Sequence, residues 1–284
     1  TDINKLTFED INDSWWKSFD KFMSDSCSTN SRAIHLRNIR SVFNDAIDEE
    51  RISLNTYPFR RFKIKTEATI KRSLTIDELV MLRDYDCEEY LEKYRDLFML
   101  IFYLIGINII DLLHLKEIRN NKIEYKRAKT GRLYSIEVLP EAKAIFDKYK
   151  GKNYILDVLD TYSNYKDFTH RLNLNLKRIG PIEIGKQNKK EIKSLFPTIS
   201  TYYARHSWAT IAASLDIPKE TIAAALGHGG NSVTDIYINF DQKKIDEANR
   251  KVIDYLHQTK NKHKSIASII ASLKQHPKAK GLDK

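Results

Sequence analysis

Apolar residues recur at helical spacing over residues 7–55, and this pattern predicts a small helical unit. The first helix is expected to follow Thr7, whose hydroxyl suits an N-cap, and the second to begin at about Ser31. The apolar stripe of the first helix comprises Ile11, Trp15, Phe19 and Phe22, and the buried positions expected on the second are Ile34, Ile39, Val42, Phe43, Ala46 and Ile47.

The pattern changes after residue 59, where a stretch without a sustained helical period begins. We interpret residues 60–74 as a basic interdomain linker, and Thr75 with Glu78 as a capping box that opens a second domain. A buried helix is expected from Arg95 to about Leu104. The basic residues of the linker are Arg60, Arg61, Lys63, Lys65, Lys71 and Arg72.

Apolar and polar residues alternate within 118–138, which predicts two strands of one small antiparallel sheet. The Lys129-Thr130-Gly131 turn between them predicts a hairpin with Lys129 at its tip and Gly131 at positive φ. Residues 180–196 are expected to form a loop. Later helices are expected over 200–215, over 218–227 with Gly227 at the C-terminus, and after a cap formed by residues 232–235. The expected fold is therefore mainly α with a small antiparallel β-sheet (α+β).

Composition narrows the class of protein further. A length of 284 residues suits two domains, and 42% hydrophobic with 30% charged residues excludes collagen-like, low-complexity and wholly disordered chains. The net charge of +10 indicates a polyanionic partner such as nucleic acid. Residues 1–59 hold 7 basic and 10 acidic residues, so the excess of positive charge lies in the later part of the chain.

Cysteine usage and hydropathy exclude other classes. The two cysteines, Cys27 and Cys87, form no CxxC pair, which argues against a disulfide framework or a structural zinc site and fits a reducing cytosol. The longest apolar run, Leu97 to Ile110, is shorter than the roughly 20 residues that span a bilayer. We expect no metal, no cofactor and no membrane partner.

Three residues late in the chain suggest phosphate chemistry. Arg205 lies among apolar neighbours in a predicted helix, where a guanidinium needs an anionic partner. His228 follows the glycine that ends a helix, and Tyr237 comes nine residues later. Arginine and histidine donate to phosphate oxygens, and a phenol can attack phosphorus. Spacing alone leaves Tyr237, one of 15 tyrosines, more often a core or rim residue.

The sequence motifs around these residues strengthen this hypothesis. TYYARHSWATIAASL and PKETIAAALGHGGNSVTDIYINF resemble the C-terminal signature of the tyrosine recombinases, with an ARH helix, an LGH turn and a later tyrosine in that order. The KTG hairpin and FYLIGINIIDLLHLK resemble other segments of this family. The resemblance extends over about 75–257 and implies a helical core-DNA-binding domain at 1–59, a basic linker at 60–74, a catalytic domain at 75–257 and a basic tail at 258–284.

The resemblance implies a role for each matched residue. Tyr237 matches the nucleophile that forms a 3′-phosphotyrosyl link, and Arg205 matches the second active-site arginine. Lys129 matches the lysine that protonates the leaving 5′-hydroxyl, and His228 the histidine that hydrogen-bonds the phosphate. The alternatives without a catalytic role are that Lys129 is an ordinary turn lysine, that His228 caps a helix and that Arg205 forms a structural ion pair. No cofactor is implied.

Two positions differ from the family pattern. Tyr202 stands where the family usually has histidine, and it can donate a hydrogen bond but cannot become cationic near neutral pH. Asn108 stands where the first arginine is usual, with Asp111 in the acidic place, so one cation is missing. The candidates for a replacement cation are Arg95, Arg127 and Arg132, and the sequence does not choose among them.

The function that the resemblance implies is a site-specific DNA recombinase or integrase of a mobile element or prophage. It implies double-stranded DNA as partner, contacts from the six basic linker residues, a tetramer on DNA linked through the C-terminal tail, accessory DNA-bending proteins, and a place on chromosomal DNA in the cytoplasm. A catalytically inactive DNA-binding protein with this scaffold is the main alternative, and a type IB topoisomerase and a helix-turn-helix protein are others. The target sequence, the crossover spacing, the direction of recombination and a preceding arm-binding domain cannot be read from the chain.

Overall fold

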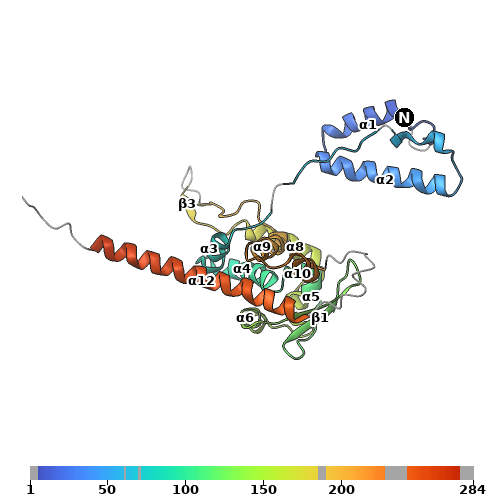
Figure 1. Ribbon diagram of the computed structural model, residues 1–284. Helices are drawn as coiled ribbons and strands as arrows, with labels where there is room; N and C mark the ends of the chain where they lie inside the picture. The colour runs from blue at the N-terminus through green and yellow to red at the C-terminus, as the bar shows by residue number, and fades with distance from the viewer. Residues whose placement is uncertain (1–5, 61, 70–71, 185–189, 228–241, 276–284) are drawn as a thin grey trace, which may run out of the picture. The chain divides into compact units, whose positions relative to one another are not determined.

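The structure of the protein is a computed structural model that describes residues 6–60, 62–69, 72–184, 190–227 and 242–275. The side chains of its last helix are described as far as Thr259. The chain divides into two compact units, Thr1–Ile70 and Lys71–Lys284 (Figure 1). Each unit has its own hydrophobic core.

The first unit contains two helices, α1 (Asp13–Ser24) and α2 (Thr29–Asp48), followed by short 3₁₀ turns at Leu54–Thr56 and Pro58–Arg60. An aromatic cluster forms its core. Trp16 packs against Phe59 with ring centroids 4.5 Å apart, and Phe8 packs against Phe43 at 4.9 Å. Large, rigid rings allow so small a unit to bury a continuous core.

Two expectations for this unit are wrong in detail. The N-cap of α1 is Asn12, whose side chain accepts from the backbone of the first turn, whereas Thr7 bonds Asp10 in a turn before the helix. On α2 the buried face runs through Ala33, Leu36, Phe43 and Ala46, so Ile34 and Val42 are more than half exposed. Small Ala33 is fully buried while the next residue, Ile34, is exposed, which helical spacing alone does not reveal.

The basic segment after residue 59 also differs from the expected linker. Phe62 stacks on Trp16 at 5.7 Å, and Ile64 packs against the same core. Farther on, Glu67 exchanges hydrogen bonds with Asn30, with its carbonyl accepting at 2.9 Å and its amide donating at 3.1 Å. The first unit therefore runs to Ile70, about ten residues beyond the boundary that charge and proline content suggested.

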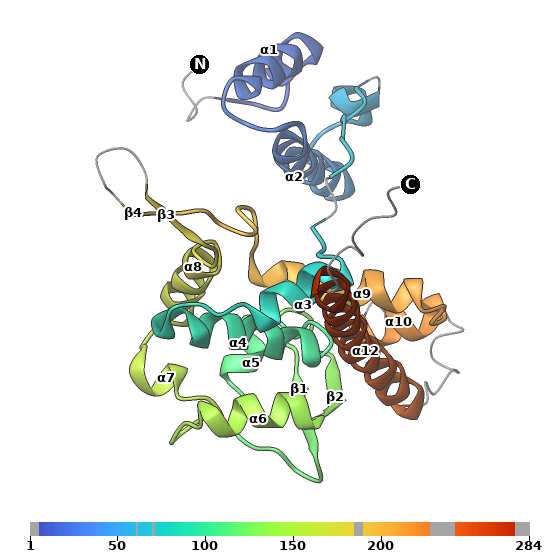
Figure 2. The same cartoon turned by 90° about the vertical axis from the view of Figure 1, so that its left-hand side faces the viewer.

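The second unit is built around α4, whose residues 97–103 are all buried. Helices α6, α8 and α9 pack against α4, and α3 and α12 pack against each other (Figure 2). The capping box of Thr75 and Glu78 opens α3, as the sequence predicted. The helices are α3 (Ile76–Asp84), α4 (Glu89–Tyr103), α5 (Ile109–Leu113), α6 (Pro140–Lys148), α7 (Val158–Thr161), α8 (Tyr165–Leu176), α9 (Thr201–Ser214), α10 (Lys219–Leu226) and α12 (Gln242–Gln275).

The predicted hairpin forms between β1 (Lys122–Lys126) and β2 (Leu133–Glu137), with Tyr125 opposite Tyr134. Its turn is closed by hydrogen bonds from the amides of Arg127 and Gly131, and Gly131 has φ +68°. A second antiparallel pair, β3 (Ile182–Ile184) with β4 (Lys190–Ile192), lies in the region expected to be a loop. Strands of three residues are too short to show a reliable alternation. The fold is mainly helical with two small antiparallel sheets among the described residues.

Helix α12 crosses the boundary that the sequence suggested between a catalytic domain and a tail at residue 258. Its first half buries Val252, Ile253 and Leu256 in the core. A buried polar chain fixes it further, because Trp208 Nε1 donates to Asn249 Oδ1 at 2.9 Å and Asn249 Nδ2 donates to the Tyr103 carbonyl at 2.9 Å. The C-terminal half extends away from the packed helices (Figure 1).

Candidate anion-binding site

A pocket of about 440 Å³ opens where the α4–α5 turn, the β1–β2 hairpin, α8 and α9 meet. Four of its lining residues are basic, Arg127, Lys129, Lys166 and Arg205, and none of the described lining residues is acidic. By contrast, a second pocket lined by residues of α5 and the hairpin includes Asp111, Glu117 and Glu124. The remaining residues lining the basic pocket are Gly106, Ile107, Asn108, Ile109, Ile110, Tyr165, Thr169, Thr201 and Tyr202.

Arg205 lies in the first half of α9 and is only 8% exposed. Its Nη1 donates to the Gly106 carbonyl at 3.1 Å, and its Nη2 donates to the Leu226 carbonyl. Gly106 has φ +70°, and a Cβ there would lie 2.4 Å from Arg205 Cα, so only glycine fits. No carboxylate of the described residues forms an ion pair with Arg205, so the structural ion pair considered for this residue is not found among them.

Burial lowers the pKa of the Arg205 guanidinium, and the positive charge of Arg127 lowers this pKa further. An arginine still keeps its proton under these conditions, because its ordinary pKa exceeds 12. Two cations that repel each other and face only neutral acceptors gain free energy when an anion enters between them.

Asn108 lies at the N-terminal end of α5, beside Arg127 from the end of β1. Two guanidinium N–H groups face its amide, so we orient the amide oxygen toward them, where it accepts from Arg127 Nε at 2.9 Å and from Nη2 at 3.0 Å. The opposite orientation would set amide hydrogens against these donors and gain one contact of 3.4 Å with Asp111. Asn108 therefore holds the guanidinium of Arg127 through a neutral acceptor.

Asp111 holds the same hairpin by a second contact. Its carboxylate is buried, and Oδ1 accepts from the Ala128 amide at 2.9 Å. Lys129, the next residue, is exposed in the turn and lines the pocket. The first turn of α5 thus fixes the backbone that carries Lys129.

Tyr134 connects the hairpin to the end of α10. Its hydroxyl donates to the Leu226 carbonyl at 3.1 Å and receives a long hydrogen bond, 3.4 Å, from Arg127 Nη1. Leu226 precedes Gly227, which ends α10 at φ +63° as the sequence predicted. The Leu226 carbonyl therefore accepts from both Arg205 and Tyr134, and links the hairpin to α9.

Tyr202 lines the same pocket and is 50% exposed. Its ring meets the edge of His206, one turn later in α9, at a centroid distance of 4.5 Å. Burial lowers the pKa of His206, and the charges of Arg205 and Arg72 lower it further. A neutral His206 is therefore favoured beside the cationic pocket at pH 7.

The other predicted site residues fall in different places. His228 and Tyr237 lie outside the described residues, as do Arg61 and Lys71, and the cap expected at residues 232–235 also lies there. Arg60, Lys63 and Lys65 are exposed on the first unit, and Arg72 is exposed on the second. The structure brings Asn108, Lys129, Tyr202 and Arg205 to one pocket.

Sequence reasoning missed Tyr134 and Lys166. The hairpin register gives a signal for Tyr134, because it pairs with Tyr125 and their rings stack at 5.2 Å on one face of the sheet. Lys166 follows the N-cap of α8, and nothing in its sequence neighbourhood distinguishes it from other surface lysines.

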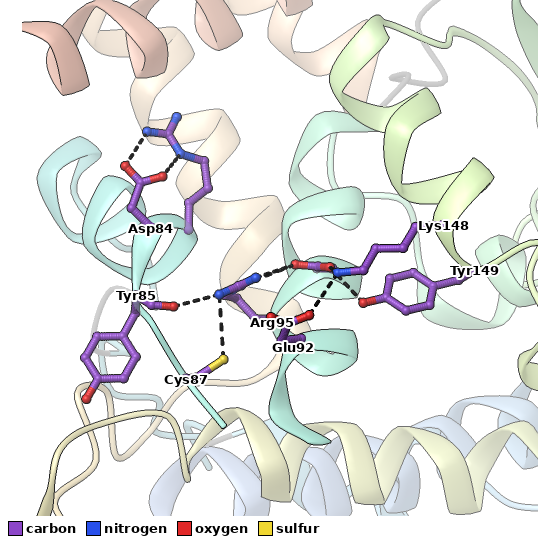
Figure 3. Close-up of polar contacts among 9 residues, drawn as sticks. Asp84, Tyr85, Cys87, Glu92, Arg95, Lys148 and Tyr149 are labelled. Atoms are coloured by element: carbon purple, nitrogen blue, oxygen red, sulfur yellow. Dashed lines mark hydrogen bonds and ion pairs between the residues drawn. The ribbon is translucent and has the colours of Figure 1, made fainter. Parts of the chain in front are cut away.

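Arg95, one of the three residues considered for the missing cation, belongs to a different cluster (Figure 3). Its guanidinium pairs with Asp96 at 3.1 Å and donates to the Tyr85 carbonyl at 2.6 Å. Asp96 also accepts from Lys148 at 2.7 Å and from the Tyr149 hydroxyl at 2.8 Å. This cluster joins the end of α3 to α4 and α6, and Arg95 does not line the basic pocket.

The described residues contain no group of three or more metal-ligating side chains. None of their helices is long and apolar enough to cross a membrane.

Comparisons with known proteins bear on the fold of both units. Residues 2–65 match the phage integrase SAM-like domain. The chain as a whole has the fold of tyrosine recombinases and integrases, with the SAM-like unit followed by a recombinase-like catalytic fold. No curated protein matches the sequence.

Solved structures provide the particular likenesses. Lambda integrase bound as a tetramer to a Holliday junction aligns with a TM-score of 0.55 at 16% identity, covering 82% of this chain and 67% of that one. A lambda integrase dimer on a COC′ core site aligns with a TM-score of 0.55 at 18% identity, covering 82% and 83%. The Tn1549 transposon integrase with circular intermediate DNA aligns with a TM-score of 0.50 at 16% identity, covering 88% of each chain. At these identities the likeness establishes the fold.

Proposed function

We propose that this protein is a site-specific DNA recombinase that cleaves and rejoins strands through a 3′-phosphotyrosyl intermediate. The observation that carries the proposal is the pocket lined by Arg127, Lys129, Lys166 and Arg205 with no acidic residue among its described lining. Such a pocket suits a phosphodiester, whose charge grows in the transition state and needs fixed cationic donors.

In the proposed reaction the phenolic oxygen of Tyr237 forms a bond to phosphorus as the bond from phosphorus to O5′ breaks. The tyrosine proton passes to a base or to water, and Lys129 gives a proton to the departing 5′ oxygen. Arg205 and His228 donate hydrogen bonds to the non-bridging oxygens, and Tyr202 adds a neutral donor. A free 5′-hydroxyl of another strand reverses these steps and restores the tyrosine.

We also propose how the protein assembles on DNA. Basic residues of the first unit and of the segment that follows it contact the DNA backbone, with Lys63 and Lys65 exposed for this role. Four copies act together on two duplexes, with the residues after about 258 exchanged between neighbours. Lambda integrase is described as a tetramer on a Holliday junction, which supports this stoichiometry for a protein of the same fold.

The test is a covalent adduct on a denaturing gel. The substrate is a nicked duplex that carries the site selected by the protein from random-sequence DNA, so that cleavage releases a short fragment and traps the enzyme. We expect an adduct with the natural protein and none with Tyr237→Phe, which differs by one hydroxyl. Equal adduct with both proteins, or none with either, overturns the proposal.

A second function is favoured by one observation. Asn108 brings no charge of its own to the pocket, and Tyr202, which also lines it, stands where histidine is usual. A DNA-binding protein that has kept the recombinase scaffold and lost catalysis would show these replacements. It would bind the selected site in a salt-dependent manner and give no adduct on the same gel.

A further inference from the structure

We propose that Arg127 supplies the cation missing at residue 108 and binds a non-bridging oxygen of the scissile phosphate, while Asn108 is a positioning residue that holds the Arg127 guanidinium. This inference deepens the proposed function and rests on it. Together, Asn108 and Arg127 would take the role of a single arginine at position 108, which is to bind a non-bridging phosphate oxygen.

Arg127 and Asn108 form a pair of defined geometry. Both guanidinium nitrogens on one edge of Arg127, Nε and Nη2, donate to the Asn108 amide oxygen at 2.9 and 3.0 Å. This bidentate contact fixes the plane of the guanidinium and leaves its other edge for further acceptors. The Tyr134 hydroxyl is the described acceptor on that side, at a long 3.4 Å.

The surroundings of Arg127 also favour a role in binding an anion. None of the salt bridges among the described residues includes Arg127, and the acceptors that it meets there are the neutral groups of Asn108 and Tyr134. Arg127 also lies close enough to Arg205 for its charge to lower the pKa of that group. Two guanidinium groups in one pocket that form no ion pair among the described residues are suited to bind a single anion between them.

The other two candidates for the missing cation lie outside the pocket. Arg95 is already neutralised by Asp96 and lies in the cluster of Figure 3. Arg132 is on the same hairpin as Arg127, but it is exposed and does not line the pocket. Only Arg127 combines a place in the pocket with a contact to residue 108.

The same geometry explains why asparagine suits position 108 in this chain. An arginine at this position would set its own guanidinium against that of Arg127 and lose the amide acceptor. We therefore expect the effects of substitutions at residues 108 and 127 to depend on each other. A substitution at one of them alone should lower the rate, and a matching change at the other should recover part of it.

The test measures the single-turnover rate of adduct formation on the nicked substrate. We expect Arg127→Gln to lower this rate about 100-fold, the scale of losing one charged donor to the transition state. Asn108→Arg alone should also lower the rate. The double variant Asn108→Arg with Arg127→Gln should recover at least tenfold relative to Arg127→Gln alone, because it restores one cation and removes the repulsion.

The matched control is Arg132→Gln, which removes the same charge from the same hairpin and should leave the rate unchanged. Thermal unfolding and affinity for uncleaved DNA are measured for every variant, so that a folding defect is separated from a chemical one. If Arg127 only supported the fold, adding Asn108→Arg would not restore the rate that Arg127→Gln loses.

Failure of this inference is distinguishable from failure of the proposed function. No adduct with the natural protein rejects recombinase activity itself. An adduct with the natural protein that persists at full rate in Arg127→Gln, or a double variant that is no better than Arg127→Gln, rejects the role of Arg127 and leaves the activity standing.

Discussion

Arg205 and Arg95 are both largely buried arginines of the second unit, yet their surroundings differ in one respect. Arg95 faces the carboxylate of Asp96, which Lys148 and Tyr149 also contact (Figure 3). Arg205 faces only the carbonyls of Gly106 and Leu226 among the described residues.

This difference distinguishes an arginine with a structural role from one whose charge is available to a ligand. A guanidinium paired with a carboxylate has its charge balanced within the fold, and an added anion would compete with that carboxylate. A guanidinium held by neutral carbonyls is fixed in place while its charge stays available. The network of carbonyl, amide and hydroxyl acceptors around Arg205 and Arg127 is therefore well suited to hold two cations for a phosphate.

The two arginines should differ most when each is exchanged for lysine. Arg205→Lys keeps the charge but cannot reach both carbonyls, so we expect adduct formation to fall about 100- to 1,000-fold, or about 3 to 4 kcal/mol in activation free energy. Arg95→Lys should leave this rate unchanged and lower only the unfolding temperature. Single-turnover gels and thermal unfolding measure the two effects. An equal loss of rate in both variants would remove the contrast between the two clusters.

The contact between Tyr134 and the end of α10 can be tested with two glycine variants. Gly227 and Gly131 both have positive φ, but a Cβ at Gly227 would lie 1.6 Å from the Tyr134 hydroxyl oxygen, whereas one at Gly131 would lie 3.5 Å from Lys126 Cε. We expect Gly227→Ala to lower the free energy of unfolding by about 2 to 4 kcal/mol and Gly131→Ala by about 1 kcal/mol.

Urea unfolding provides the measurement for the two glycine variants. In a Tyr134→Ala background the cost of Gly227→Ala should approach that of Gly131→Ala, because only the backbone strain is left. A cost that is the same in both backgrounds would show that Tyr134 does not press on the end of α10.

The carboxylate of the Arg95 cluster is tested by Asp96→Asn. This change leaves a partly buried guanidinium without its anion, so we expect the free energy of unfolding to fall by about 2 kcal/mol and the adduct rate to stay the same. Asp147→Asn is the matched control, since it removes the exposed Lys143–Asp147 pair and should cost about 0.3 kcal/mol. Equal costs would mean that the buried cluster adds no more stability than a surface pair.

The smallest effect is the pH dependence of the same carboxylate. Burial raises the pKa of Asp96, but hydrogen bonds from Lys148 and Tyr149 and the charge of Arg95 lower it by more, so the net pKa lies below 3.8. The stability that Asp96 contributes is therefore complete above the unfolded value and is lost as the pH falls through the folded pKa. The difference in unfolding free energy between the natural protein and Asp96→Asn should be constant above about pH 5 and shrink below about pH 3.5. A difference that grows on acidification would contradict this sign.

Much of the fold could be predicted because its signals are local. The capping box at Thr75, the turn glycine Gly131 and the C-terminal glycine Gly227 each act within a few residues. The predictions failed where a distant partner decided the outcome. The core of the first unit buries Ala33 in place of Ile34, and the basic segment after residue 59 folds back because Phe62 stacks on Trp16.

The candidate site shows the same division. The order of its sequence motifs singled out Lys129, Tyr202 and Arg205, which line one pocket, and it identified Asn108 as lacking a charge. It could not choose among Arg95, Arg127 and Arg132, because a basic residue looks the same in the sequence whether or not a carboxylate meets it in space.

The sequence by itself determined which residues are available: the excess of positive charge, the positions of the helix caps and turns, and the order of the candidate catalytic groups. Only the tertiary structure decided which charges are balanced. That choice depends on contacts between segments far apart in the chain, such as Asn108 with Arg127 and Leu226 with Arg205, and on the burial that makes an unbalanced charge costly.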